Sequence, residues 1–332
     1  MNNTNKPNIV CIGGGTGTFV VLRGLKYQPC QLSAIVSMSD SGGSNKRIRD
    51  EFGLLPTSDI RQCLVALSDE NDGIGPLRKL FMYRFKKGNG LFGMTFGNIF
   101  MAALADILGS QREAIRQTGK VLRIRGSVFP VTFTKTSLYA QYEDGTVLRE
   151  EHLIDEPTHD GRIKIDRIFL KPSAKANPEA IDAIHNANLI ILGPGDVYTS
   201  VIPNLLIDGI RNAILNTKAK KVYIVNLMTK FGQTYNFSAY DHLKVIESYT
   251  GIPMDYIIIN NGKIPDKALR IYEQSHEQPV IDDIPETFKK TVIRSNIVNY
   301  FLVHKAAGDL LKRSLIRHDS KKLAAIIMKL II

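Results

Sequence analysis

Cysteines are few in this sequence, and they are not spaced for metal binding or disulfide pairing. The 332 residues include three, Cys11, Cys30 and Cys63, with no C-x-x-C pair among them. An odd number of widely separated cysteines excludes a disulfide-rich scaffold and gives no support to a zinc site. We therefore expect reduced, buried thiols, as in a cytosolic protein.

Long hydrophobic runs are also missing. No apolar stretch approaches the ~18 residues that a membrane helix requires, and we interpret the C-terminal segment LAAIIMKLII as a packed terminal helix. The N-terminal segment MNNTNKPNIV lacks the basic region and the apolar core of a secretory signal. These absences predict a cytoplasmic protein without a membrane span.

The net charge of +11 is the strongest compositional bias. A basic surplus is typical of proteins that bind nucleic acid, anionic membranes or phosphorylated small molecules. Here the Lys and Arg residues are scattered in pairs at most, without a basic tail, an RNP-like pattern or a zinc-finger pattern. We therefore predict no nucleic-acid partner and favour a phosphorylated ligand, while a merely soluble basic surface stays open.

Apolar strands and helices alternate along most of the chain. The predicted strands are NIVCIGG, LSAIVSM, ANLIILGPG, KKVYIVN and MDYIIIN. Helices are predicted from about Thr16, after Pro56, two or three times within 74–119, and around 204–216, 238–249 and 266–277. Near-continuous apolar strands are buried on both faces, so the pattern predicts an α/β fold, with a Rossmann-like, mostly parallel sheet covered by helices.

The alternation is interrupted by a β-rich segment over about 127–172. It contains SVFPVTF, SLYAQYEDGTVLREEHLI and RIKIDRIFL, with Asp144-Gly145 as the expected hairpin turn. We predict an antiparallel insertion or flap within a single α/β domain that spans 1–332. Its role as a lid, a dimer element or a partner surface stays open.

Polar residues follow the predicted strands, in the segments GGGTG, SMSDSGG, LGPGDVYTS, VNLMT and INNG. Ligands of open parallel sheets bind in the crevice outside the carboxyl ends of the strands. The repeated pattern therefore predicts a ligand cleft at this edge of the sheet.

The glycine-rich segment after the first strand is the best candidate for a phosphate site. Its residues are Gly13, Gly14, Gly15, Thr16 and Gly17. Glycines let the backbone approach a phosphate, and the amides at the following helix start bind the anion. Thr18 stands where a dinucleotide fingerprint has its third glycine, and no Gly-Lys-Ser/Thr follows, so neither standard motif is present. A tight turn without a ligand is the alternative.

The segment after the second strand suggests a further anion cradle built from Ser39, Asp40, Ser41 and Gly42. Asp40 also stands where dinucleotide-binding folds place the acidic residue that binds ribose, which keeps a nicotinamide enzyme open. A flexible polar loop is the alternative.

Asp59 and Arg61 lie at a predicted helix start. Asp59 either caps that helix or holds Mg²⁺ or substrate, while Arg61 would meet a phosphate. Asp40 and Asp59 are the candidate metal ligands. His242 and His318 have no catalytic spacing, so we expect them at the surface or at helix caps. Further candidate ligand contacts are Asn98, Gly193, Gly195, Tyr198, Thr199 and Asn226.

Several of these segments together resemble one family. They are IGGGTGTFVVLRGLK, SMSDSGGSNKRIRDEFGLLPTSDIRQCLVALS, GNIFMAAL, LGPGDVYTSVIPNLLIDGI, VNLMTKFGQTYNFSAYDHLKVI and IRHDSKKLA. In this order they resemble the gluconeogenesis factor family (YvcK type), which is related to 2-phospho-L-lactate transferase (CofD-like). The resemblance implies a cytoplasmic bacterial protein needed for cell shape and for growth on gluconeogenic carbon sources. It also implies binding of UDP-sugars such as UDP-N-acetylglucosamine.

The resemblance adds Tyr272 and Arg317 as ligand contacts. It also shows two departures: Ser58 replaces a usual glycine before Asp59, and Met94 stands where a histidine is common. Loss of that histidine favours binding over chemistry.

Three functions follow from these patterns. The first is a sensor that binds a nucleotide-diphosphate sugar and acts through protein partners in cell-wall precursor synthesis. The second is a transferase of the 2-phospho-L-lactate type, which would use a nucleotide-diphosphate donor and Mg²⁺. The third is a nicotinamide enzyme, which the broken glycine fingerprint disfavours. We also expect a homo-oligomer, and no cofactor is assigned beyond Mg²⁺ as a candidate.

Overall fold

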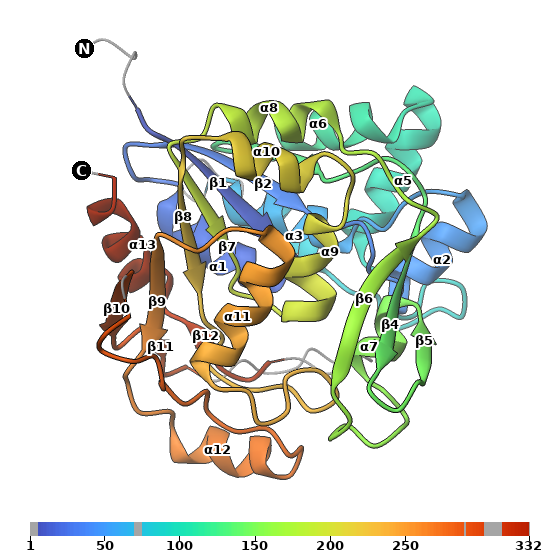
Figure 1. Cartoon of the computed structure of the whole chain (residues 1–332). Coiled ribbons are helices and arrows are strands. Elements are labelled where there is room, and N and C mark those ends of the chain that lie inside the picture. The colour runs from blue at the N-terminus through green and yellow to red at the C-terminus, as the bar shows by residue number, and fades with distance from the viewer. Residues whose placement is uncertain (1–5, 70–74, 289, 302–313, 332) are drawn as a thin grey trace.

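The computed structural model describes residues 6–69, 75–288, 290–301 and 314–331. A seven-stranded sheet forms the centre of the molecule (Figure 1), and every neighbouring pair of its strands is parallel. Its strands are β1 (Asn8–Gly13), β2 (Gln31–Val36), β3 (Ser127–Pro130), β7 (Leu189–Leu192), β8 (Lys220–Ile224), β9 (Tyr256–Asn260) and β10 (Thr291–Ser295). Their order is β10-β9-β8-β7-β1-β2-β3, so the predicted Rossmann-like α/β fold is confirmed.

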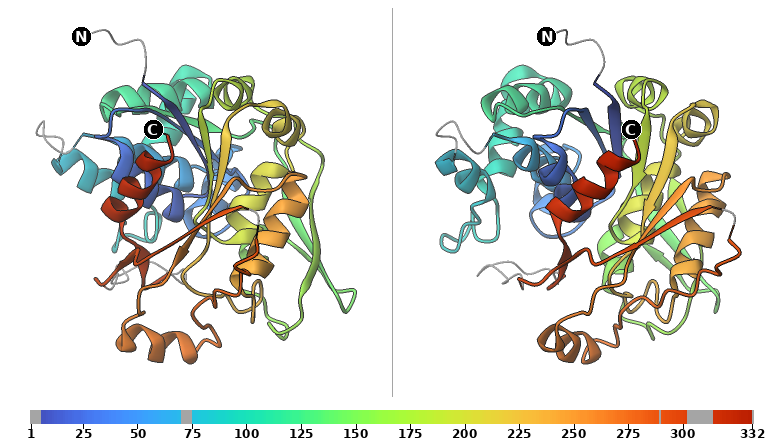
Figure 2. Two further views of the ribbon diagram at one scale, coloured as in Figure 1. Left: turned by 60° about the vertical axis from the view of Figure 1, so that its left-hand side comes forward. Right: turned by 90° about the vertical axis from the view of Figure 1, so that its left-hand side faces the viewer.

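Helices cover both faces of this sheet because the strand order reverses between β1 and β7. Right-handed crossovers in opposite directions place their helices on opposite faces, as the views in Figure 2 show. One layer contains α1 (Thr16–Leu25), α3 (Ser58–Leu67) and α13 (Ser320–Lys329), which contact each other through α1. The other contains α9 (Ile202–Leu205), α10 (Ile210–Asn216) and α11 (Ala239–Thr250).

The remaining helices complete the outer shell. They are α2 (Gly43–Phe52), α4 (Gly75–Met82), α5 (Phe96–Leu108), α6 (Gln111–Val121), α8 (Pro178–His185) and α12 (Asp266–Glu273). The polar segment after the second strand, for which a flexible loop was the alternative to an anion cradle, is a loop only up to Gly42, because α2 begins at Gly43. The predicted helix at 204–216 is divided at Gly209, whose φ of +103° is incompatible with a continuous helix.

The predicted β-rich insertion is present but begins later than expected. Its antiparallel sheet has the order β5-β4-β6 and consists of β4 (Ser137–Tyr142), β5 (Val147–Arg149) and β6 (Ile165–Lys171). The short helix α7 (Glu151–Asp155) connects β5 to β6. Ser127–Pro130, which we assigned to the insertion, instead joins the parallel sheet as β3, because it pairs with β2 and buries Val128 there.

The core lies between the sheet and its two helix layers. All four residues of β7 are buried, and so are five of the six in β1, as expected for strands covered on both faces. The predicted terminal helix is confirmed as α13, which packs closely on α1. A Cβ at Gly24 would lie 2.0 Å from the carbonyl oxygen of Ser320, so only glycine permits this approach.

The three cysteines are free, with Cys11 and Cys63 buried and Cys30 half-buried. No helix in the described ranges combines the length and the apolar character needed to cross a bilayer.

Candidate ligand-binding site

A cleft of about 500 Å³ opens at the carboxyl edge of the parallel sheet. It is lined by the segments that follow β1, β2, β7 and β8, together with residues of α7, α12 and the segment before α13. β1 and β7 are neighbours at which the strand order reverses, and such a switch point is where open α/β sheets bind ligands. The position of the cleft therefore agrees with the edge predicted from the strand endings.

The glycine loop lies at the centre of this edge. Gly14, Gly15, Thr16 and Gly17 line the cleft between β1 and the first turn of α1. Gly17 packs against the turn that follows β7, since a Cβ at this position would lie 1.7 Å from the carbonyl oxygen of Pro194. The first-turn amides of a helix have no partner within the helix, so α1 presents an anion-binding end to the cleft.

A second helix begins at the same edge. Gly42 and Gly43 line the cleft at the start of α2, and Gly43 has a φ of +52°. The Asp40 side chain accepts a hydrogen bond of 3.0 Å from the Gly42 amide, which fixes the turn into the helix. The amino ends of α1 and α2 therefore both face the cleft.

Asp59 belongs to the cleft and does not cap α3. Thr57 occupies the N-cap position, without a side-chain capping bond, and Asp59 lies in the first turn. Its carboxylate lies against the glycine loop, because a Cβ at Gly15 would be 2.4 Å from Asp59 Oδ1. Asp59 and Asp40 both line the cleft, as the metal hypothesis requires.

The turn after β7 forms the opposite wall. Gly193 and Gly195 have φ values of +75° and +154°, and the peptide bond between Gly193 and Pro194 is cis. Gly195 and Thr199 line the cleft, whereas Gly193 does not. Tyr198, which we named as a candidate ligand contact, is buried, with its ring 6.5 Å from that of Phe237. It belongs to the core beneath the cleft.

Asn226, Tyr272 and Arg317 all line the cleft, although they are distant in sequence. The Asn226 side-chain oxygen is buried and has no hydrogen-bond partner among the described residues, which leaves an acceptor for a ligand. The Tyr272 hydroxyl accepts hydrogen bonds from the amides of Leu315 and Ile316, at 2.9 and 3.2 Å. Tyr272 therefore holds the segment that carries Arg317 into the cleft.

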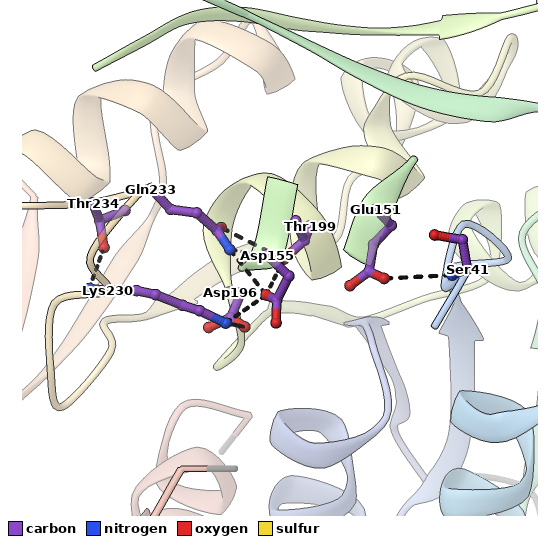
Figure 3. A network of polar contacts seen from close by, with 8 residues as sticks. All are labelled: Ser41, Glu151, Asp155, Asp196, Thr199, Lys230, Gln233 and Thr234. Atoms are coloured by element: carbon purple, nitrogen blue, oxygen red, sulfur yellow. Dashed lines mark hydrogen bonds and ion pairs between the residues drawn. The ribbon is translucent and has the colours of Figure 1, made fainter. Parts of the chain in front are cut away.

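A polar network that the sequence did not reveal borders the same cleft (Figure 3). Lys230 forms ion pairs with Asp155 of the insertion and with Asp196, the latter at 3.0 Å. Gln233 donates a 3.0 Å hydrogen bond to Asp155, and Thr199 lies beside both. Burial alone would lower the pKa of Lys230, but the two carboxylates outweigh it and raise the pKa above its ordinary value. Burial of Asp155 would raise the pKa of that carboxyl group, but the charge of Lys230 lowers it.

Glu151, at the start of α7, brings another carboxyl group to the cleft. It accepts a 3.4 Å hydrogen bond from the Ser41 amide (Figure 3). Burial raises its pKa well above the ordinary value, and the nearby charges of Asp40, Asp155 and Asp59 raise it further. A neutral Glu151 is able to donate a hydrogen bond as well as accept one.

Arg61 and Asn98 lie behind the cleft and do not line it. Both are buried, and Arg61 donates a 2.9 Å hydrogen bond to the Asn98 side chain. Asn98 in turn donates to the hydroxyls of Ser44 in α2 and Ser58 in α3, at 2.9 and 3.0 Å. These contacts connect α5, α3 and the start of α2, so the two residues position the cleft wall.

Three more of the predicted residues also support the wall. Gly13 ends β1, and its carbonyl accepts a hydrogen bond from the Ser37 amide. Ser39 is buried against the Ser37 hydroxyl at 2.7 Å. The buried Ser41 hydroxyl lies 2.9 Å from His152 Nδ1, which attaches α7 of the insertion to the turn after β2.

The two histidines are buried, so our expectation of surface or capping positions was wrong. His242 Nδ1 lies 2.8 Å from the carbonyl of Ser238, the N-cap residue of α11, and His318 Nε2 lies 3.2 Å from the Val225 carbonyl. Their main role is to fill polar positions in the interior, although His318 also borders the cleft.

Sequence reasoning missed Glu151, Asp155 and Lys230, whereas Asp196 lies within the predicted segment LGPGDVYTS but was not named as a contact. Lys230 directly follows the predicted segment VNLMT, so the same polar-ending rule would have found it. Glu151 and Asp155 had no such signal, since only the docking of the insertion brings α7 to the cleft.

Mg²⁺ fits the chemistry of the cleft, although no group of three or more metal-ligating side chains occurs in the described ranges. Mg²⁺ is typically held by one or two carboxylates together with substrate phosphates. Asp40 and Asp59 supply such oxygen donors beside the two helix ends. A metal at this place would depend on the phosphates of a bound ligand.

A larger hollow of about 1030 Å³ lies at the opposite edge of the sheet. Two of its three lining cations are already engaged: Lys26 donates to the Ser68 carbonyl at 2.8 Å, and Arg125 pairs with Asp69. The cleft at the carboxyl edge is therefore the stronger candidate for a phosphorylated ligand.

Comparisons with known proteins agree with this fold and with the resemblance. The family model described as 2-phospho-L-lactate transferase CofD matches residues 9–299. The chain is 42% identical to the gluconeogenesis factor of Bacillus subtilis over 98% of each chain, and 40% identical to a putative gluconeogenesis factor of Aquifex aeolicus over 98% of this chain and 97% of that one. The crystal structure of protein BH3568 from Bacillus halodurans superimposes with a TM-score of 0.87, at 37% identity, and covers 98% of this chain and all of that one. The chain therefore belongs to the CofD family and is similar over almost its whole length to gluconeogenesis factors.

Proposed function

We propose that the cleft binds a nucleotide-diphosphate sugar, of which UDP-N-acetylglucosamine is an example, and that the protein acts as a sensor of this ligand. The observation that carries the proposal is the convergence of two helix amino ends, α1 and α2, on one cleft at the sheet's switch point. Both ends supply amides and a positive helix dipole, which suit a diphosphate.

Two further residues of the cleft suit other parts of such a ligand. Asn226 offers a buried acceptor for an N–H group of a base or an N-acetyl sugar. Arg317 adds a planar guanidinium that is able to pair with a phosphate oxygen. A volume of about 500 Å³ lies within the usual range for ligand pockets.

Mg²⁺ is part of the proposal because the cleft also contains several carboxylates. Asp40, Asp59 and Asp155 would repel a diphosphate across short distances in a partly dry site. A divalent cation held by Asp40 and Asp59 would offset that repulsion. We therefore expect binding to be stronger with Mg²⁺.

The wider role that we propose has two sources. Because the relatives are named gluconeogenesis factors, we propose that this protein supports growth on gluconeogenic carbon sources. The resemblance of the sequence segments to that family leads us to propose a role in cell shape and a cytoplasmic location as well. We also propose that it functions as a homo-oligomer of single-domain subunits and acts on partners in cell-wall precursor synthesis.

A transferase activity is the second candidate. Glu151 favours it, because a carboxyl group with a raised pKa beside a phosphate site is suited to proton transfer. The family match to 2-phospho-L-lactate transferase supports the same reading. Such an enzyme would transfer a phosphoryl-bearing group from the diphosphate of its nucleotide donor to an acceptor, with release of the nucleoside monophosphate. Mg²⁺ would stabilise the charge on that leaving phosphate.

The test is calorimetric titration with UDP-N-acetylglucosamine, with and without Mg²⁺, with GDP and NAD as comparators. We expect micromolar binding that Mg²⁺ strengthens and that Arg317→Ala abolishes, without turnover of the ligand. Exposed Arg270→Ala on α12 is the matched control, since Arg270 does not line the cleft. Mg²⁺-dependent binding of GDP, without detectable binding of the UDP-sugar, would contradict the sensor and favour the transferase.

A further inference from the structure

The outer face of the insertion sheet carries an unusual group of aromatic and basic side chains. Tyr139 of β4 and Phe169 of β6 are cross-strand neighbours whose rings stack at 5.3 Å with an angle of 10° between their planes. Their strands turn Leu138, Ala140 and Ile168 inward, where these residues are buried. The opposite face therefore points away from the core of the molecule, at the right of Figure 1.

Three exposed cations surround this aromatic pair. The guanidinium groups of Arg149 and Arg167 lie 5.8 and 5.6 Å from the ring centres of Tyr139 and Phe169, respectively. The Lys171 ammonium lies 5.9 Å from the first ring and 5.3 Å from the second. Contacts of this kind hold long basic side chains in place on a surface where they would otherwise be mobile.

The described residues do not balance the charge of this face. In the ranges that the structure describes, none of the three cations has a carboxylate partner. The neutral side chain of Gln141 is the hydrogen-bond partner of Arg167, at 3.0 Å. The nearest acid on these strands, Asp166, lies where the register between β4 and β6 shifts. We call the five residues Tyr139, Arg149, Arg167, Phe169 and Lys171 the cationic face.

We propose that the cationic face is a docking site for an acidic, extended segment of a partner protein. Arg167 and Lys171 are four residues apart on β6 and so about 13 Å apart along the strand. An extended segment with carboxylates at positions i and i+4 has the same spacing. Arg149, across the sheet on β5, offers a third contact to such a segment.

Two other occupants fit the face less well. Single-stranded nucleic acid binds by stacking its bases on open aromatic rings, whereas these two rings stack on each other and are covered by the cations. A twofold contact between two copies of the face would bring like charges together. An acidic protein segment matches the charge without needing a free ring.

The test measures binding of a fluorescein-labelled peptide of alternating Glu and Thr to the full chain by anisotropy. The face variant is Arg149→Glu, Arg167→Glu and Lys171→Glu, and a second variant carries glutamine at the same positions. A control with the same charge change is Lys87→Glu, Arg116→Glu and Lys120→Glu, all at exposed sites outside the insertion. Circular dichroism checks that each variant is folded.

We expect the affinity of the face variant for the peptide to fall about tenfold. The glutamine variant should show most of this loss of affinity, while the affinity of the control should change less than about twofold. Equal losses in the face and control variants would overturn the proposal, because net charge would then explain the binding. If binding of an oligouridylate of equal charge falls more in the face variant than binding of the peptide does, the site belongs to nucleic acid and the proposal is overturned. A concentration-dependent molar mass that falls in the face variant would assign it to a second copy.

Discussion

Lys230 is the cation on which the polar network beside the cleft depends. Its side chain is 18% exposed, and those of its partners Asp155 and Asp196 are 20% and 33% exposed. Removal of one member of a buried ion pair costs about 3–5 kcal/mol, because it leaves an uncompensated charge. Since all three groups keep some contact with solvent, we expect Lys230→Met to lower the free energy of unfolding by about 2–3 kcal/mol.

Urea unfolding followed by circular dichroism measures this loss. The matched control is Lys220→Met, which breaks the exposed pair with Asp255 at 3.1 Å and should cost less than about 1 kcal/mol. Adding Asp155→Asn and Asp196→Asn to Lys230→Met should restore most of the stability, because the remaining side chains are then neutral. If Lys230→Met costs no more than Lys220→Met, or if the asparagines restore nothing, our account of the network is wrong.

Three further predictions concern the loop and the buried titratable groups. Gly17→Ala should destabilise the fold by ~3 kcal/mol and abolish ligand binding, because its Cβ would lie 1.7 Å from a backbone carbonyl oxygen. Urea unfolding and calorimetric titration measure the two effects, and Gly75→Ala, whose Cβ would meet open space, is the control for both. Burial lowers the pKa of His242 and of His318 to about 4, so the unfolded chain binds protons between pH 6.5 and 4 that the folded chain does not. As the pH falls through that window, each histidine should lower the free energy of unfolding by about 3 kcal/mol. A urea midpoint that stays constant between about pH 7 and about pH 5 would contradict this. The raised pKa of Glu151 gives the opposite pH dependence of stability, since the folded chain keeps a proton that the unfolded chain loses above pH 4.5. Glu151→Gln should therefore raise the urea midpoint at about pH 8 and leave it nearly unchanged at about pH 4. An equal shift at both pH values would refute the raised pKa.

The sequence was sufficient for features that depend on local pattern. The apolar strands β1 and β7, and the glycine segments after them, identified a parallel sheet and the edge at which its cleft lies. This worked because strand burial and turn geometry are determined mainly by neighbouring residues. The helix α2 was missed because its polar sequence, beginning at Gly43, has no apolar periodicity and resembles a loop.

The sequence was insufficient where long-range packing decides a residue's role. Arg61 has the chemistry of a phosphate ligand, but its helix turns it toward Asn98 and away from the cleft. Tyr198 follows a strand end yet packs against Phe237, because the π-helix η1 (Val197–Val201) turns it inward. Glu151 enters the site only because the insertion folds back over the sheet.

The central claim is that a nucleotide-diphosphate sugar binds between the glycine loop and the start of α2. Hydrogen–deuterium exchange of the full chain, with and without UDP-N-acetylglucosamine and Mg²⁺, tests it most directly. Our account predicts slower amide exchange in 14–18 and 42–45, and no change in 26–31, which borders the hollow at the opposite edge. Slower exchange confined to 26–31, with the two helix starts unchanged, would contradict the account.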